Sequence, residues 1–197
     1  MIYNFEYELK LMLTETEYES LIVLDGCDAF KQVNNYFDTC DFSMYSKKTV
    51  IRIREKDNSF ELTVKTTKGA AKDAGVVAMD ENNLVIDENT AVDLLSGESD
   101  IRRFLPGDII ASGEKLIYVG KITTIRKKIR INEKLPMAEL DKSIYDDTAD
   151  YELEWEISED KYNEAVGNLK DIGILIEGRL SGLSKYGRLI ERLRKGK

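Results

Sequence analysis

The chain has 197 residues, of which 37 are acidic and 29 are basic, so its formal net charge is −8 at neutral pH. This acidic balance argues against a general nucleic-acid binder, and no apolar run approaches the roughly 20 residues that a membrane-spanning helix needs. Histidine is absent, which excludes histidine-dependent triads and leaves acid–base chemistry to carboxylates, lysine, tyrosine or metal-bound water.

We expect a single domain over residues 1–197 that works in the cytoplasm, with no nucleic-acid or membrane partner. The N-terminus lacks the basic and then apolar layout of a signal peptide. Cys27 and Cys40 are too few for a disulfide scaffold or a four-cysteine zinc site. The sequence leaves the oligomeric state open.

Charged and apolar residues alternate over the first predicted strand, residues 2–13. Glu6, Glu8 and Lys10 share one face of this strand, because successive side chains of a strand point to opposite faces. Thr14 and Glu17 have the spacing of a capping box, which predicts a helix over 15–24 that ends at Gly26. Residues 34–38 are typical of a short strand.

The next part of the chain predicts a hairpin. Strands over 48–55 and 60–65 flank Asp57-Asn58, which is a turn signal. Arg52 and Arg54 share one face of the first strand, and Lys65 lies on the charged face of the second. Residues 68–75 are predicted as a loop, and residues 89–95 and 99–105 as two short helices.

Three further strands and two helices are predicted toward the C-terminus. The strands cover 121–131, 137–143 and 151–157, and the helices cover 158–172 and 182–194. Each of these strands is charged on one face, which carries Arg126, Lys128 and Arg130, then Glu139 and Asp141, then Glu152, Glu154 and Glu156.

The signs of these charged faces are sorted by strand. Aligned glutamates repel one another unless a cation holds them, and aligned basic residues likewise call for an anion. A solvated face explains any one of the strands equally well. The full set favours a closed barrel with a charged interior and apolar outer faces under helices, because buried charge is costly unless it is paired or coordinated.

The chemistry of the charged residues indicates a ligand. Carboxylate ligands without histidine or cysteine suit Mg²⁺ or Mn²⁺ better than zinc. Several arginines and lysines aimed at one point suit an anion with several phosphates. Together they describe a metal–polyphosphate site, in which a metal-held water can act as the nucleophile.

Several segments resemble the CYTH superfamily, also called the triphosphate tunnel metalloenzymes. Residues 6–10 match its ExExK signature, residues 35–39 its YFDT segment and residues 52–54 its RxR strand. Residues 61–65, 139–141 and 151–156 resemble its later strands, and residues 184–188 resemble its C-terminal SKYxR helix. The matches follow the family's order along nearly the whole chain. Residues 76–81 depart from it, since they are less acidic than the family's strand at that place.

The resemblance implies an α+β fold, namely a closed eight-stranded antiparallel barrel, or tunnel, with a charged lumen and helices packed on the outside. It implies a hydrolase of inorganic or organic triphosphate that uses Mg²⁺ or Mn²⁺. The implied metal ligands are Glu6, Glu8, Glu154 and Glu156, with Glu152 and Asp141 as helpers; which of the glutamates at 152, 154 and 156 bind metal stays open. The implied phosphate contacts are Lys10, Arg52, Arg54, Lys65, Arg126, Lys128 and Lys185. The implied catalytic residues are Glu6, Glu8, Lys10 and Arg54.

Three other hypotheses stay beside this one. The same superfamily contains class-IV adenylyl cyclases, which need an adenine pocket that the sequence does not reveal. A polyphosphate-binding module without turnover would carry the same charges. A lipocalin-like carrier fits less well, because its lumen should be apolar.

Overall fold

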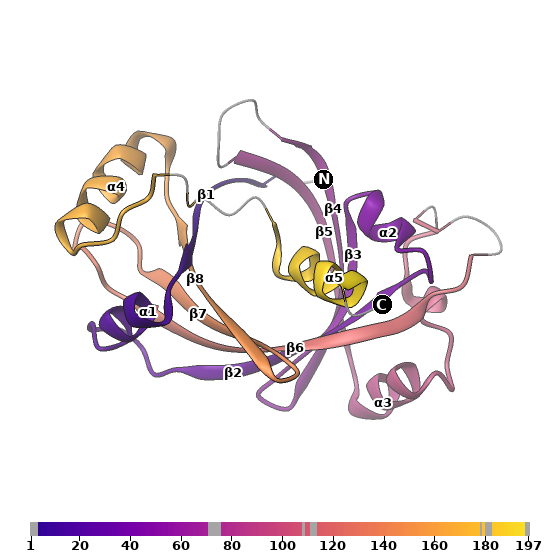
Figure 1. The fold of residues 1–197 in the computed structure, drawn as a ribbon. Coiled ribbons are helices and arrows are strands. Elements are labelled where there is room, and N and C mark those ends of the chain that lie inside the picture. The colour runs from indigo at the N-terminus through magenta and orange to yellow at the C-terminus, as the bar shows by residue number, and fades with distance from the viewer. Residues whose placement is uncertain are drawn as a thin grey trace.

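The described residues form eight antiparallel strands in one curled sheet. The computed structural model describes residues 4–70, 76–107, 109–110, 114–177, 179 and 183–195, without the side chains of 4–7, 68–70 and 76–79. The strands are β1 (Asn4–Leu13), β2 (Phe30–Asp38), β3 (Thr49–Lys56), β4 (Ser59–Ala70), β5 (Val76–Ile86), β6 (Ile117–Ile129), β7 (Ala138–Tyr145) and β8 (Thr148–Glu156). They pair in the order β1-β5-β4-β3-β2-β6-β7-β8 and return to β1 (Figure 1).

Helices connect and cover the strands. The α-helices are α1 (Glu15–Ile22), α2 (Ser43–Ser46), α3 (Glu88–Ser96), α4 (Tyr162–Asp171) and α5 (Lys185–Lys195), and the 3-10 helices are η1 (Ile101–Phe104) and η2 (Glu159–Lys161). The capping box predicted at Thr14 is confirmed, since the Glu17 N–H donates to Thr14 and the Glu17 carboxylate accepts from the Thr14 N–H. Ser158, which directly precedes η2, makes no side-chain capping bond.

Gly26 has a different role from the predicted one. Helix α1 ends at Ile22, and Gly26 instead bridges to Ile129 at the end of β6. A Cβ atom at Gly26 would lie 2.0 Å from the carbonyl oxygen of Lys128. Glycine is needed there because the two backbones approach too closely for any side chain.

The hairpin predicted at Asp57-Asn58 is confirmed. Both residues have positive φ, 50° and 60°, as a tight two-residue turn between twisted strands requires. The strand after it, β4, pairs with β5, which the sequence pattern did not reveal. β5 is therefore the one strand of the sheet, as far as the structure describes it, that lies where the alternation of charged and apolar residues predicts none.

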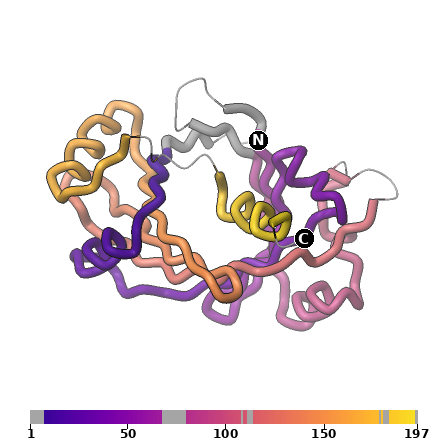
Figure 2. The backbone as a smooth tube through the Cα atoms, in the orientation of Figure 1, coloured from indigo at the N-terminus to yellow at the C-terminus, as the bar shows by residue number. Residues whose placement is uncertain are grey.

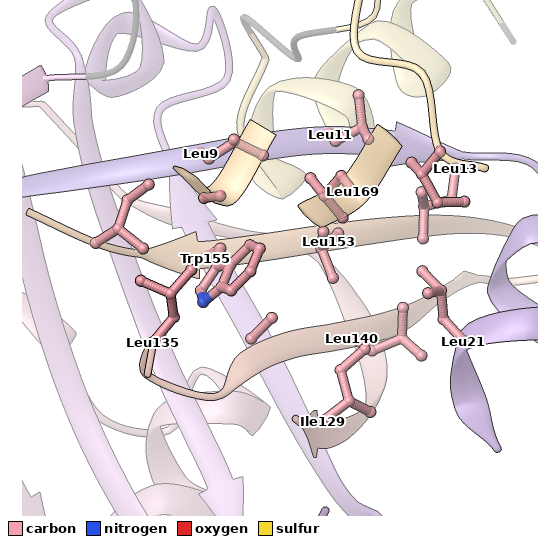
Figure 3. Close-up of a cluster of buried hydrophobic side chains, with 14 of the residues drawn as sticks. Leu9, Leu11, Leu13, Leu21, Ile129, Leu135, Leu140, Leu153, Trp155 and Leu169 are labelled. Carbon is pink, nitrogen blue, oxygen red and sulfur yellow. The ribbon is translucent and has the colours of Figure 1, made fainter. Parts of the chain in front are cut away.

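The convex face of the sheet is apolar and buried, as predicted. Figure 3 shows the larger cluster, in which Leu9 and Leu11 of β1 pack with Leu153 and Trp155 of β8. Residues of α1 and α4 complete this cluster, and the Trp155 indole donates to the Pro136 carbonyl at 2.8 Å. A second cluster packs residues of α3 and η1 against β3 and β4. Burial of these two clusters is the main source of stability for the sheet.

Helix α5 is on the concave face, which corrects the expected architecture. Tyr186, Leu189 and Ile190 of α5 are buried against Tyr36, Ile122 and Tyr145, and these three lie on the same strand faces as the charged residues. Figures 1 and 2 show α5 within the curl of the sheet. The expected closed tunnel with all helices on the outside is therefore wrong in that form, because an apolar inner patch binds α5.

The pairing of β1 with its two neighbours, which forms the seam of the curled sheet, also differs from that of a regular barrel. β1 pairs with β8 through residues 8–13, but with β5 through Asn4–Tyr7 and Val76–Met79. No described residue of β1 pairs with both neighbours, so β5 and β8 bind different parts of this strand. The fold is a deep trough with a short seam, and α5 occupies one end of the trough.

Candidate functional site

The concave face carries the charged residues in register. Glu8 of β1 lies opposite Glu156 of β8, and Lys10 lies opposite Glu154. On the other side of β8, Glu154 lies opposite Glu139 and Glu152 opposite Asp141, both on β7. Arg126 and Lys128 of β6 then lie opposite Asp141 and Glu139. The period of two along each strand thus brings acidic and basic rows side by side.

Glu154 is the centre of the ionic network. The Lys10 and Lys185 ammonium groups each lie 2.9 Å from its Oε1 atom. Its Oε2 atom lies 2.7 Å from Nη2 of Arg126. Both oxygens of this buried carboxylate are therefore neutralised by basic residues from three separate elements, β1, β6 and α5.

Arg126 binds the acidic residues of β7. Its Nε and Nη2 atoms donate to the two oxygens of Asp141 at 2.7 and 2.6 Å, the paired geometry that suits a guanidinium and a carboxylate. Its Nη1 atom contacts Glu139, which also lies 3.4 Å from the Lys128 ammonium. Arg126 is thereby fixed between β7 and β8.

Helix α5 adds two cations to the network. The Lys185 ammonium lies 2.9 Å from Asp141 and 3.1 Å from Glu152. One turn later, Arg188 donates to Asp150 at 2.9 Å and to Glu152 at 2.5 Å. Residues three apart on a helix share a face, so this single turn of α5 neutralises the most buried acids of the sheet.

The pKa values of the network follow from this pairing. Burial alone would raise the pKa of Glu154, but Lys185, Lys10 and Arg126 outweigh burial and hold the pKa well below its ordinary value. Burial would lower the pKa of both lysines, but the carboxylates around them raise it instead. The pKa of Glu8 is raised, chiefly because the carboxylate is buried and only partly offset by Lys10.

A second group of basic residues lies on β3, across the trough. Arg54 donates from Nε to the Asn34 amide oxygen at 3.0 Å, and its pKa is lowered by burial and by the charges of Arg52 and Arg126. The Nε atom of Arg52 is buried without a hydrogen-bond partner among the described residues. Neither arginine forms an ion pair within 4 Å with a described carboxylate, although Glu61 of β4 lies opposite Arg54 and its charge partly offsets the lowering of the Arg54 pKa.

Lys65 lies farther along, on β4. Its ammonium is 3.3 Å from Glu81 of β5, on the strand that the sequence pattern missed. Burial would raise the pKa of Glu81, but Asn83 and Lys65 lower it. This ion pair is partly exposed and belongs to the same concave face as Arg52 and Arg54.

Exposure of the charged side chains increases along the trough away from α5. Asp141 and Glu152 are fully buried, Glu139 is one-quarter exposed, and Lys128 is 48% exposed. The apolar contacts of α5 cover the opposite end. The end of the ionic network that Lys128 and Glu139 line is therefore its more exposed end.

The structure brings together many of the residues that the sequence singled out. Glu8, Lys10, Arg126, Glu154 and Lys185 form one network with the helpers Asp141 and Glu152, while Arg52, Arg54 and Lys65 lie across the trough. Glu156 is exposed and opposite Glu8, and the side chain of Glu6 lies outside the described residues. Arg130 follows the end of β6 and pairs with Glu133 at 3.6 Å.

Sequence reasoning missed Arg188, Asp150, Asp38 and Tyr186. The hydroxyl of Tyr186 donates to Asp38 at 2.7 Å, which joins α5 to the end of β2. Asp38 and Tyr186 both lie in segments that the family resemblance covers. The sequence motifs at residues 35–39 and 184–188 include both residues, but only the structure shows that these two motifs are in contact.

The carboxylates suit a hard divalent cation in their chemistry. Within the part of the chain that the structure describes, no three acidic or thiol side chains are grouped so as to hold a metal ion. Both oxygens of Glu154 are engaged by Lys10, Lys185 and Arg126. A cation could use Glu154 only if some of these basic groups moved to another anion.

No helix among the described residues has the length and apolar character that a membrane span requires.

Comparison with solved structures shows that this chain is similar to two proteins over nearly its whole length. HpAC1 from Hippeastrum is 25% identical, with a TM-score of 0.72, over 98% of this chain and 96% of that one; it is named as an adenylyl cyclase with a dominant triphosphatase activity. The bh2851 protein of Bacillus halodurans, named as an adenylate cyclase, is 26% identical, with a TM-score of 0.69, over 95% and 98% of the two chains.

Comparison of sequences agrees with the structural likeness. YjbK of Bacillus subtilis (strain 168), which carries the name of a triphosphatase, is 26% identical over 162 residues, or 81% of this chain and 80% of the relative. The CYTH domain model matches residues 4–186. This match runs from β1 into α5 and takes in all eight strands, so the chain belongs to the CYTH domain family.

Proposed function

We propose that this protein hydrolyses a triphosphate, inorganic or organic, in the concave face of its sheet and with the help of Mg²⁺ or Mn²⁺. The observation that carries the proposal is the partly buried pair Arg52 and Arg54, which have no described carboxylate within salt-bridge distance but face a network rich in carboxylates. Partly buried positive charge that forms no ion pair with a described residue favours an anion that arrives from solution. The names of YjbK and HpAC1 support triphosphate as that anion.

The basic residues would bind the phosphates. Arg52, Arg54 and Lys65 lie on one side of the trough and Arg126 and Lys128 on the other, so a chain of phosphates between them meets cations on both sides. Lys10 and Lys185 would exchange Glu154 for phosphate oxygens. Phosphoryl transfer depends mainly on such positioning and charge neutralisation.

The carboxylates would hold the divalent cation. Glu8 and Glu156 face each other across β1 and β8, and Glu154 adjoins both; Glu6 is two residues before Glu8 on the same strand. These are the residues that we assign to the cation, which supplies charge neutralisation at the phosphate oxygens and activation of the attacking water. Release of Glu154 by the two lysines would couple cation binding to phosphate binding.

The net reaction is simple. Water adds to the terminal phosphorus, the bond between that phosphorus and the bridging oxygen breaks, and phosphate and a shortened phosphate chain leave. The arginines stabilise the charge that develops on the leaving oxygen. An adenylyl cyclase would instead release diphosphate and form a cyclic nucleotide, and two relatives bear that name.

One assay separates these alternatives. The purified protein is incubated with inorganic triphosphate, thiamine triphosphate or ATP, each with Mg²⁺, Mn²⁺ or a chelator, and phosphate and cyclic AMP are measured together. We expect phosphate release that the chelator stops. Cyclic AMP as the main product would favour the cyclase, and tight triphosphate binding without product would favour a binding module. Folded protein that neither binds nor hydrolyses any of the three would refute the proposal.

A further inference from the structure

The carboxylate of Asp38, at the end of β2, is fully buried and receives five hydrogen bonds. Three come from the backbone N–H groups of Thr39, Met44 and Tyr45, at 2.7, 2.9 and 3.0 Å. The other two come from the hydroxyls of Thr39 and Tyr186, at 3.3 and 2.7 Å. Asp38 therefore ties the turn that holds α2 to the first turn of α5.

Tyr186 is held in place on two further sides. Its ring stacks on Tyr36, with centroids 4.8 Å apart and an angle of 15° between the planes. Tyr45 meets it edge-on at 5.9 Å. Burial and the bond to Asp38 raise the pKa of Tyr186, so its hydroxyl stays a donor at every working pH.

Tyr186 directly follows Lys185, whose ammonium contacts Asp141, Glu152 and Glu154. Successive residues of a helix point about a quarter of a turn apart. Tyr186 can therefore pack on Tyr36 of β2 while Lys185 contacts the carboxylates of β7 and β8. The position of the Lys185 backbone, and with it the reach of its ammonium, depends on how this turn is anchored.

We propose that Asp38 and Tyr186 form a positioning pair that fixes Lys185 at the ionic network. The consequence for catalysis rests on the function proposed above, whereas the placement of Lys185 does not. Asp38 keeps its three backbone donors when the Tyr186 hydroxyl is removed. Tyr186→Phe therefore leaves the α2 turn satisfied and breaks only the link to α5.

The first test needs no substrate. Lysines of the wild type and Tyr186→Phe are modified with an acetylating reagent for short times, and the rates at Lys185 and Lys10 are compared by mass spectrometry. Both lysines contact Glu154, but only Lys185 is on α5. We expect the rate at Lys185 relative to Lys10 to rise roughly tenfold, as the loss of a bond to a charged group allows. A variant that is merely less stable would speed both sites equally.

Tyr45→Phe is the matched control. It removes a hydroxyl from a ring that touches Tyr186, while the bond from Tyr45 to Asp38 is made by the backbone and stays. We expect this variant to keep the wild-type ratio of rates. An unchanged ratio in Tyr186→Phe, or an equal rise in Tyr45→Phe, would overturn the proposal whether or not the protein hydrolyses triphosphate.

The second test uses turnover of inorganic triphosphate. We expect Tyr186→Phe to raise KM about tenfold with a smaller change in kcat, because a phosphate contact is displaced. In a double-mutant cycle with Lys185→Ala, the effect of Tyr186→Phe should disappear, since no ammonium remains to be positioned. Equal effects of Tyr186→Phe with and without Lys185 would overturn the catalytic part. Absence of all turnover, together with the expected labelling ratio, would instead count against the proposed function alone.

Discussion

Lys10 and Lys185 lie at opposite ends of the chain but contact the same oxygen of Glu154, each at 2.9 Å. Two ammonium groups can lie so close because Glu8, Glu152 and Asp141 add negative charge around them. The groups assigned to phosphate and the groups assigned to the cation thus neutralise one another. Binding of both ligands would exchange one set of ion pairs for another rather than create new buried charge.

Removal of the partly buried Arg54 tests the residues that we assign to phosphate binding. We expect Arg54→Ala to lower kcat for triphosphate at least about tenfold, because a group that stabilises the developing charge is lost. The measurement is phosphate release at saturating substrate. Lys31→Ala, which removes an exposed cation of the neighbouring strand β2, should retain normal turnover. Near-normal turnover in Arg54→Ala would remove this residue from the site.

Neutralisation of the Glu8 carboxylate tests the residues that we assign to the divalent cation. Glu8→Gln keeps the shape of the side chain but removes its charge, so we expect kcat to fall at least about tenfold and the half-saturating concentration of Mg²⁺ to rise. Titration of activity with Mg²⁺ measures both quantities. Glu55→Gln changes an exposed carboxylate on the outward face of β3 and should match the wild type. An unaltered titration in Glu8→Gln would contradict the assignment.

The Glu17–Arg179 ion pair predicts a pH-dependent part of the stability. Hydrogen bonds from Arg179 and Thr14 lower the pKa of Glu17 to about 2, against about 4.5 for the free side chain. A carboxylate with a lowered pKa stabilises the folded state above its unfolded pKa, and this stabilisation is lost as the pH falls toward about 2.

Glu17→Gln tests this pair, since glutamine can keep the capping box. The difference in free energy of unfolding between the wild type and Glu17→Gln should be constant above about pH 5 and shrink as the pH falls. Urea unfolding at several pH values measures it. Glu19→Gln, at an exposed position of the same helix, should show no such trend. A difference that grows in acid would contradict the assignment.

The convex core predicts a large stability effect far from the site. Leu153 of β8 is fully buried between the sheet and α4, so Leu153→Ala should lower the free energy of unfolding by about 2–5 kcal/mol. Urea unfolding with a constant m value checks this. Val85→Ala, at a valine that is 77% exposed, should change it by less than about 0.5 kcal/mol. Similar small effects in both variants would mean that this convex face is not the core.

Alternation of charged and apolar residues predicted most of the strands and both of their faces. Ile51 and Ile53 point into the outer core, while Arg52 and Arg54 between them point into the trough. Because side chains alternate between the two faces of a strand, burial of the isoleucine face directs both arginines to the other face. The inward direction of the charged faces could be inferred because so many strands carried ionisable residues at every second position.

β5 was missed because its residues are poor strand formers. It contains the run 80–83, Asp-Glu-Asn-Asn, and such residues are depleted in strands. Pairing with β4 along residues 60–70 imposes the strand, and Glu81 then finds Lys65. Tertiary pairing of this kind leaves no signal in the periodicity of the segment itself.

The place of α5 could not be predicted for a related reason. Tyr186, Leu189 and Ile190 have helical spacing, which predicts an amphipathic helix. It does not tell which sheet face the helix will cover. That choice depends on Tyr36, Ile122 and Tyr145, three apolar positions within otherwise polar strand faces.

The pairing of the first strand with the eighth has a kinetic consequence. Leu9 pairs with Trp155, which is far away in the sequence. Closing so long a loop costs conformational entropy before the contacts between the two strands can stabilise the structure. Chains with such high contact order refold in milliseconds to seconds rather than microseconds. The Lys10–Glu154 bond should therefore be among the late events of refolding, and the ionic network is completed only as the protein reaches its native state.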